Sequence, residues 1–263
     1  MDEKLAAFER LLGIMDTLRA ECPWDKKQTF ESLRTLTIEE VYELAEAISK
    51  GDKEEIKKEV GDLLLHIVFY AKLGSESGDF DIKSIIHQLC DKLIYRHPHI
   101  YGDVQVKNDR EVADNWEAIK LKEKQENDEP KTVLGGVPST LPALIKAHRI
   151  QDKARGVGFD WDKKEQVWDK VSEELGELQS EIRQLNAERM EEEFGDLFFS
   201  LVNAARLYGI NPENALEKTN QKFIQRFNYL ESKTLQKGIS LRSLSLDEME
   251  VYWQEAKQME RGV

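Results

Sequence analysis

One pattern of acidic residues occurs twice in this chain, and both copies have the same internal spacing. Each copy has the form EExxE, followed after a spacer by ExxD, and every acid recurs at one constant offset, so that 40 matches 174 and 59 matches 193. Composition alone does not explain two copies in register, so the pattern indicates duplication of a folded unit. The acids are Glu39, Glu40, Glu43, Glu59 and Asp62 in the first copy, and Glu173, Glu174, Glu177, Glu193 and Asp196 in the second.

The spacing of these acids predicts an antiparallel helical hairpin in each copy. Residues three apart, such as Glu40 and Glu43, share one helix face. A glycine at 51 followed by an aspartate at 52 predicts a helix end and a new helix start. Residue 51 lies midway in sequence between Glu43 and Glu59, and also between Glu40 and Asp62. If the chain turns at residue 51, the two members of each pair lie opposite each other at the same height along the hairpin. In the second copy the midpoint is residue 185.

Four carboxylates at close range repel one another unless protons or cations are supplied. A ligand set of oxygens alone favours Mg²⁺, Mn²⁺ or Ca²⁺ over zinc. We therefore predict a site for one of these divalent cations at the acids of the second copy, and a possible second site at those of the first. The predicted ligands are Glu174, Glu177, Glu193 and Asp196, and in the first copy Glu40, Glu43, Glu59 and Asp62.

Two other interpretations of the acids need to be considered. Glutamate-rich helix faces are often simply solvated, and Thr37 with Glu40 has the spacing of a capping box. A di-iron site of the ferritin type would need Glu-x-x-His motifs, which neither hairpin contains. His66 follows Asp62 at i+4 instead, and we interpret it as a histidine at the edge of the core.

Basic residues distinguish the two copies. Lys170 and Arg189 each lie four residues before an acid of the second copy and so face the same side of their helices. The corresponding residues of the first copy are Leu36 and Glu55. This difference predicts that the second copy is the efficient site, and that the first is weak or structural.

A second group of residues suits a phosphate chain and a base. Lys222 and Arg226 are four apart, so two cations share one helix face. The first copy has a matching pair at Lys92 and Arg96. Trp253 either stacks on a base or anchors the core.

Helical periodicity runs through nearly all of the chain, which predicts an all-α fold of two tandem helical-bundle domains. We expect a first domain at residues 1–121, a charged linker at 122–136 and a second domain at 137–263. On the return helix of the first hairpin the predicted apolar stripe is Val60, Leu63, Leu64, Ile67 and Val68. The predicted helices span 5–20, 30 or 37–50, 52–73, 81–95, 111–124, 141–153, two within 163–208, 212–230 or beyond, and 246–258.

Charge and composition limit the partners of the chain. Its 263 residues carry a formal net charge of −13, which argues against nucleic acid or an anionic membrane as a partner. The longest apolar run is too short and too interrupted to span a bilayer. With two cysteines, no disulfide framework and no signal-peptide pattern at the start, we expect a cytoplasmic location.

The doubled acid motif, with the KxxxR and Trp blocks, resembles the MazG nucleoside triphosphate pyrophosphohydrolases over nearly the whole chain. The resemblance implies the all-α NTP pyrophosphohydrolase fold, a homodimer, Mg²⁺, and cleavage of (d)NTPs to monophosphate and pyrophosphate. By the same resemblance the second copy is the competent one. The nucleotide contacts carried over to this chain are Lys170, Arg189, Lys222, Arg226 and Trp253.

The expected reaction is metal-assisted hydrolysis of broad specificity, for housekeeping of the nucleotide pool. A metal lowers the pKa of bound water, and Glu173 is the candidate to orient or deprotonate that water. Two alternatives without turnover stay open at this point. One is a dimeric helical interaction protein that binds divalent cations, and the other is a nucleotide sensor.

Overall fold

The computed structural model describes residues 2–108 and 132–260, together with positions 111, 112, 115, 116, 119 and 123. Within these residues every regular element is a helix, which confirms the predicted all-α fold. The chain forms two compact units, Met1–Lys107 and Asn108–Val263, and each is described by itself. The helix expected at 111–124 lies largely outside the described residues, as does most of the expected linker, while 132–136 contains no helix.

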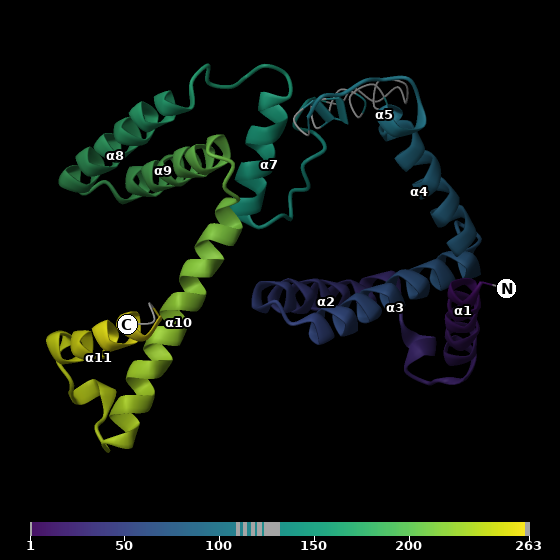
Figure 1. Ribbon diagram of the computed structural model, residues 1–263, viewed down its shortest axis with the longest axis horizontal. Coiled ribbons are helices and arrows are strands. Elements are labelled where there is room, and N and C mark those ends of the chain that lie inside the picture. The colour runs from purple at the N-terminus through teal and green to yellow at the C-terminus, as the bar shows by residue number, and fades with distance from the viewer. Residues whose placement is uncertain are drawn as a thin grey trace. The chain divides into compact units, whose positions relative to one another are not determined.

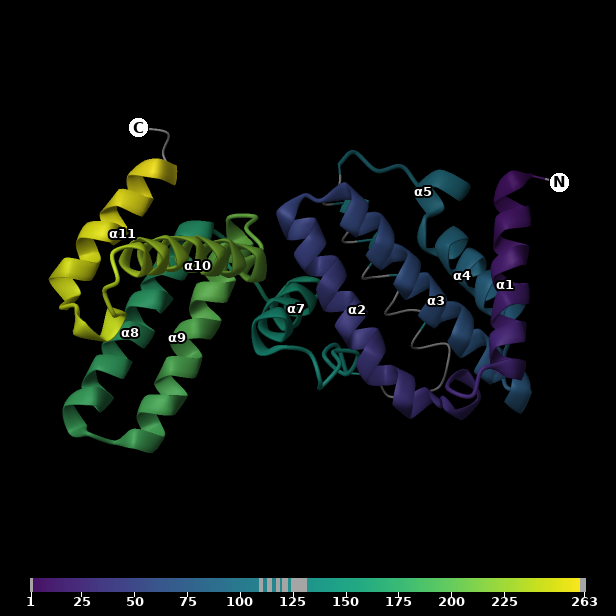
Figure 2. The same ribbon diagram turned by 90° about the horizontal axis from the view of Figure 1, so that it is seen from below.

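The first unit is built around the long hairpin of α2 and α3, which Figures 1 and 2 show side by side. Helix α1 packs on α3, and the buried core between them and α2 comprises Met15, Leu33, Val68, Phe69 and Leu73. The elements are α1 (Glu3–Glu21), a 3₁₀ turn (Asp25–Lys27), α2 (Phe30–Lys50), α3 (Lys53–Ser77), α4 (Ile82–Arg96) and α5 (Pro98–Tyr101).

Local sequence fixes where this hairpin begins and turns. Thr29 and Ser32 form a reciprocal capping box at the start of α2, so the helix begins at Phe30 and not at Thr37. The turn confirms the predicted stop and start, because Gly51 ends α2 in the left-handed region at φ 69° and the side chain of Asp52 caps α3. Thr37 lies inside α2, so the capping-box interpretation of Thr37 and Glu40 is wrong.

The apolar stripe predicted on α3 is only partly correct. Val68 is buried in the core, as expected. The side chains of Val60, Leu64 and Ile67 are between 38% and 50% exposed instead. Within its own unit the hairpin therefore covers only part of its apolar surface.

The second unit contains a hairpin of the same design, α8 with α9. Gln184 is the last residue of α8, Leu185 occupies the left-handed region at φ 57°, and Asn186 caps α9. The other helices begin and end within a few residues of their predicted limits, and α10, predicted to reach Leu230 or beyond, extends to Gln236. The elements are α7 (Ala143–Arg155), a 3₁₀ turn (Lys164–Gln166), α8 (Val167–Gln184), α9 (Ala187–Leu207), α10 (Pro212–Gln236), a 3₁₀ turn (Leu241–Ser243) and α11 (Leu246–Glu260).

Contacts within the second unit extend the hairpin into a small bundle. Helix α7 packs on α9 and α10, and α11 folds back along α10. Its buried residues lie mainly on α8, α9 and α10. They include Val167, Leu178, Val202, Ala204, Leu230, Thr234 and Ala256.

Candidate metal and nucleotide site

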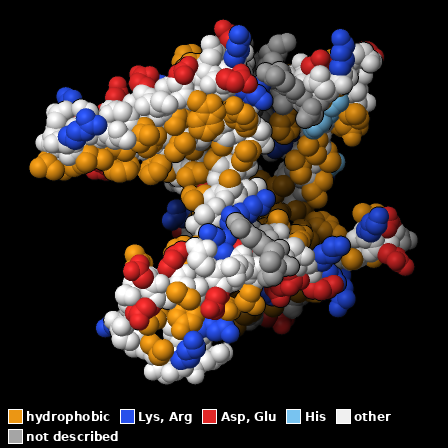
Figure 3. Space-filling model, turned by 60° about the vertical axis from the view of Figure 1, so that its left-hand side comes forward, with side chains coloured by type: hydrophobic (Ala, Val, Ile, Leu, Met, Phe, Trp, Pro, Cys, Tyr) orange, Lys and Arg blue, Asp and Glu red, His pale blue; other side chains and the backbone are white. Residues whose placement is uncertain are grey.

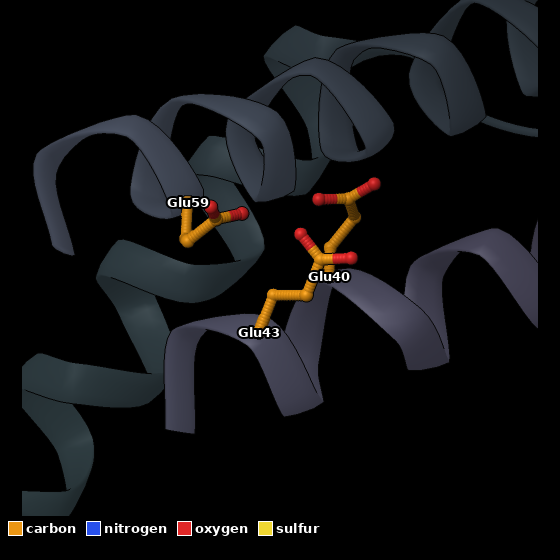
Figure 4. A group of neighbouring side chains, drawn as sticks. All are labelled: Glu40, Glu43 and Glu59. Atoms are coloured by element: carbon orange, nitrogen blue, oxygen red, sulfur yellow. The ribbon is translucent and has the colours of Figure 1, made fainter. Parts of the chain in front are cut away.

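Three of the four acids predicted in the first hairpin come together. Glu40 and Glu43 project from α2 and Glu59 from α3, and their carboxylates converge between the two helices (Figure 4). One oxygen from each lies within 4.8 Å of the other two. Since Glu40 and Glu43 are one turn apart and the hairpin turns at Gly51, this meeting follows directly from local helix geometry.

The second hairpin repeats this arrangement with Glu174 and Glu177 from α8 and Glu193 from α9. One oxygen of each again lies within 4.8 Å of the other two. The two clusters occupy equivalent positions of the repeat, because each member of one matches a member of the other at the same offset in sequence. The duplication therefore preserves a three-carboxylate site and not merely a helical hairpin.

The fourth predicted acid of each hairpin lies outside its three-membered cluster. Asp62 is half-buried and Asp196 is exposed. Both are near enough that their negative charges raise the pKa of a cluster member, Glu40 for Asp62 and Glu193 for Asp196. The structure thus places them at the edge of the clusters and not at the centre.

Burial makes these clusters suitable for a divalent cation. Glu59 is 2% exposed and Glu174 is 6% exposed. Carboxylates seldom lie fully buried without a partner. One oxygen each of Glu59 and Glu193 is buried with no hydrogen-bond partner. A buried carboxylate oxygen without a donor is costly, and an oxygen-only set of this kind fits a hard cation such as Mg²⁺ or Mn²⁺.

The pKa values of two acids reflect the same cost of burying carboxylates close together. Desolvation, followed by the charges of Asp62, Glu43 and Glu59, raises the pKa of Glu40 above its ordinary 4.5. Desolvation, followed by the charges of Glu177 and Asp196, raises the pKa of Glu193 above the same value. In both hairpins the folded protein therefore holds a proton more tightly than the unfolded chain does.

These raised pKa values predict how stability depends on pH. Glu40 and Glu193 contribute stability to the metal-free protein that is fully present below the ordinary carboxyl pKa and is lost as the pH rises through their raised pKa values, because the unfolded state then binds fewer protons. At pH 7.5 a free Mg²⁺ concentration 100-fold above Kd should add about 2.7 kcal/mol. For a chain of this size that corresponds to roughly 5–10 °C in melting temperature.

Melting followed by circular dichroism, with Mg²⁺ and with EDTA, measures this effect. At pH 5, which is closer to the raised pKa values, protons compete with Mg²⁺ for the carboxylates, so the shift produced by Mg²⁺ should be smaller. A shift that is equal at both pH values, or larger at pH 5, would contradict a carboxylate site.

Lys170 contacts the second cluster itself. Its Nζ lies 2.6 Å from Oε1 of Glu174 and 3.0 Å from Oε1 of Glu173. The hydrogen bond with Glu174, and then that with Glu173, raises the pKa of Lys170. Glu173, the candidate base, is about half exposed and lies beside the cluster. The side-chain contact predicted from the i,i+4 spacing is therefore present.

The other predicted cations have partners of their own or lie exposed. Arg189 is 66% exposed in its side chain and lies 3.9 Å from Glu181. Arg226 pairs with Glu260 at 2.7 Å and lies over the ring of Trp253 at 5.8 Å. Lys222 is exposed on α10. The ring of Trp253 packs against Phe223 at 5.0 Å and remains half-buried, so it combines packing with an accessible edge.

Sequence reasoning missed several residues around the clusters. Lys58 donates to Glu59 at 2.9 Å, and one oxygen of Glu181 is buried without a partner. The i,i+4 spacing of Glu177 and Glu181 could have signalled the latter. The hydrogen bonds that the Thr37 hydroxyl shares with Nδ1 of His66, at 2.9 Å, and with the hydroxyl of Tyr70, at 2.6 Å, were also missed. His66 is 8% exposed and lies in a buried polar network, as its interpretation as a core-edge histidine requires.

Comparison with known proteins gives a consistent result. A family model for the MazG nucleotide pyrophosphohydrolase domain matches residues 28–101 and 163–230, which are the two acidic hairpins with flanking segments. A nucleoside triphosphate pyrophosphohydrolase of Escherichia coli strain K12 is 42% identical, over 96% of this chain and 98% of its own length.

Two further relatives come from Thermotoga maritima. A nucleoside triphosphate pyrophosphohydrolase/pyrophosphatase MazG is 42% identical, over 98% of both chains. The crystal structure of a MazG-related protein is 28% identical and matches 43% of this chain and 98% of its own, with a TM-score of 0.39. Two matches to the family model, each centred on one acidic cluster, and identity over nearly the full length show that this chain belongs to the MazG nucleotide pyrophosphohydrolase family.

Proposed function

We propose that the chain hydrolyses nucleoside and deoxynucleoside triphosphates to the monophosphate and pyrophosphate, with Mg²⁺ as cofactor and Mn²⁺ as a substitute. The observation that carries the proposal is the buried cluster of Glu174, Glu177 and Glu193 with Lys170 beside it. Membership of a nucleotide pyrophosphohydrolase family supports the same reaction.

The cluster and its edge would hold the metal through Glu174, Glu177, Glu193 and Asp196. A bound Mg²⁺ lowers the pKa of coordinated water and neutralises phosphate charge. Asp196 is included because it lies close enough to raise the pKa of Glu193 and is free to turn inward from its exposed position. The equivalent set in the first hairpin would hold metal in the same way.

The reaction itself needs a water positioned for attack on the α-phosphorus. Glu173 adjoins the cluster, accepts the proton of that water and holds it while the new O–P bond forms. The bond between the α-phosphorus and the bridging oxygen breaks, and pyrophosphate leaves with both electrons of that bond. Lys170, Arg189, Lys222 and Arg226 stabilise the charge on the phosphates, and Trp253 offers its exposed edge to the base.

A product-resolved assay tests this reaction. With ATP and a panel of dNTPs in Mg²⁺, we expect monophosphate and pyrophosphate in equal amounts, with rates that vary modestly with the base. Phosphorus NMR separates pyrophosphate from orthophosphate. Release of orthophosphate would reject attack at the α-phosphorus, and metal-dependent melting shifts without turnover would favour a binding or sensor protein.

Broad specificity and a cytoplasmic role in nucleotide-pool housekeeping form part of the same proposal. The residues assigned to the nucleotide are four cations, which suit phosphates, and one tryptophan, which can stack on any base. In the part of the chain that the structure describes, no helix is both long enough and apolar enough to cross a membrane.

A homodimer completes the proposal and is supported by apolar surface on the hairpins. On α9, Phe194, Phe198 and Leu201 follow helical spacing and are 44%, 60% and 42% exposed. Figure 3 shows apolar side chains gathered in continuous bands on the surface, which is typical of interaction sites.

The oligomeric state can be tested by light scattering after gel filtration. We expect twice the chain mass for the wild type and a monomer for Phe198→Glu, because a buried charge at an apolar interface is costly. Leu185→Glu, at the 83% exposed turn of the same hairpin, is the matched control and should remain dimeric. A monomeric wild type at micromolar concentration would reject the dimer.

A further inference from the structure

Lys170 forms ion pairs with two acids to which the proposed reaction assigns other roles, one as a metal ligand and one as the base. Its ammonium group contacts Oε1 of Glu174 at 2.6 Å, and Glu174 is one of the three clustered carboxylates. The same ammonium contacts Glu173 at 3.0 Å, the candidate base. One cation therefore neutralises both a metal ligand and the group that would accept a proton.

We infer that Lys170 is a stand-in cation, which holds Glu174 until a divalent metal ion binds and then moves to the triphosphate. The inference rests on the proposed function, and it concerns the order of events at the site. Metal binding would release Lys170 and, with it, Glu173. Nucleotide binding would follow, because the lysine gains a free charge only after it leaves the carboxylates.

Charge and burial support this assignment. The side chain of Glu174 is only 7% exposed. Its charge is therefore poorly screened by solvent and needs a counterion in the absence of metal. An ammonium group and a divalent ion cannot both lie against this carboxylate without strong mutual repulsion. The side chain of Lys170 is 40% exposed. Because its ammonium sits on a flexible four-carbon stem, the head group can leave without rearrangement of the helix.

The first hairpin serves as an internal comparison. Leu36 replaces Lys170 there, and the cluster acid that pairs with a lysine is Glu59, on the opposite helix. That lysine, Lys58, also contacts a second acid, Glu55, at 3.4 Å, at the position where the second hairpin has Arg189. If metal displaced Lys58 from Glu59, the lysine would still be held by neighbouring acids such as Glu55. We therefore expect metal binding to promote polyanion binding at the second hairpin only.

The decisive experiment measures metal and nucleotide affinity separately in a Lys170→Met variant. The full chain carries Glu43→Gln throughout, which weakens the first cluster, so that the second cluster dominates the titration. Calorimetric titration with Mn²⁺ in the absence of nucleotide should give at least threefold tighter binding for Lys170→Met, because no lysine competes for Glu174. Binding of an α,β-methylene triphosphate in saturating Mn²⁺ should become at least threefold weaker.

Opposite signs of the two effects distinguish a stand-in cation from a structural lysine, whose loss would weaken both or neither. Arg183→Met removes one exposed positive charge from α8 itself, on a different helix face from Lys170, and should leave both affinities within twofold. A Lys170→Met change below threefold in either titration, or in the same direction in both, would overturn the inference, as would an equal effect of Arg183→Met. Neither titration uses turnover, so failure of the proposed reaction would be recognised separately by its products.

Discussion

Glu177→Gln should reduce pyrophosphate release by at least about a hundredfold, whereas Glu43→Gln should leave it within about threefold of the wild type. The two glutamates occupy equivalent positions of the repeat, and each belongs to a three-carboxylate cluster. Glutamine has nearly the same shape as glutamate, so the substitution removes a charged ligand without leaving a cavity. The difference between the variants therefore reports which hairpin supports catalysis.

The expected asymmetry has its physical reason in the cations. The second hairpin has Lys170 at its cluster and Arg189 one turn before Glu193, where the first has Leu36 and Glu55. With only the pair Lys92 and Arg96, the first site offers a triphosphate fewer cations, and a metal ion neutralises only part of the phosphate charge.

Steady-state rates measured with ATP and Mg²⁺ check this prediction, and thermal melting of both variants serves as the control for folding. Neither substitution should lower the melting temperature of the metal-free protein, since each removes one member of a repelling set. Equal losses of activity in the two variants would show that both hairpins are catalytic and would reject the argument from charge.

Removal of divalent metal should abolish activity altogether. With excess EDTA we expect a decrease of at least about a thousandfold, because the reaction then loses both the activated water and the neutralisation of the phosphates. Mg²⁺ or Mn²⁺ should restore the rate, since oxygen-only ligands favour hard cations. The measurement is pyrophosphate release after dialysis against EDTA and re-addition of each ion.

A structural effect of metal must be separated from a catalytic one. The melting shift produced by Mg²⁺ should decrease in Glu177→Gln and in Glu43→Gln, while only the former loses activity. Activity that persists in EDTA would eliminate the metal mechanism, whatever the melting curves show.

Much of the candidate site could be predicted because it depends on local geometry. The positions of Glu40, Glu43 and Glu59 follow from helix periodicity and from the glycine at 51, which is in the left-handed region where glycine is favoured. The contact of Lys170 with Glu174 is likewise an i,i+4 relation on one helix. Predictions of this kind need no knowledge of how distant helices pack.

Predictions that depend on packing were less accurate. Periodicity assigned Val60, Leu64 and Ile67 to the core, but it does not say which part of an apolar stripe a neighbouring helix covers. The pairing of Arg226 with Glu260 joins α10 to α11 across 34 residues of sequence. Such a contact depends on how the two helices cross, and no spacing rule predicts it.

The sequence by itself determined the duplication, the two hairpins and the acids that face one another, because these follow from periodicity and turn residues over short stretches of chain. Tertiary structure alone decided that Glu59 and Glu174 are buried while Asp62 and Asp196 lie at the edge. It also decided that Arg226 pairs with Glu260 on another helix. Burial and choice of partner depend on the surrounding helices and on side-chain conformation, which a one-dimensional pattern does not contain.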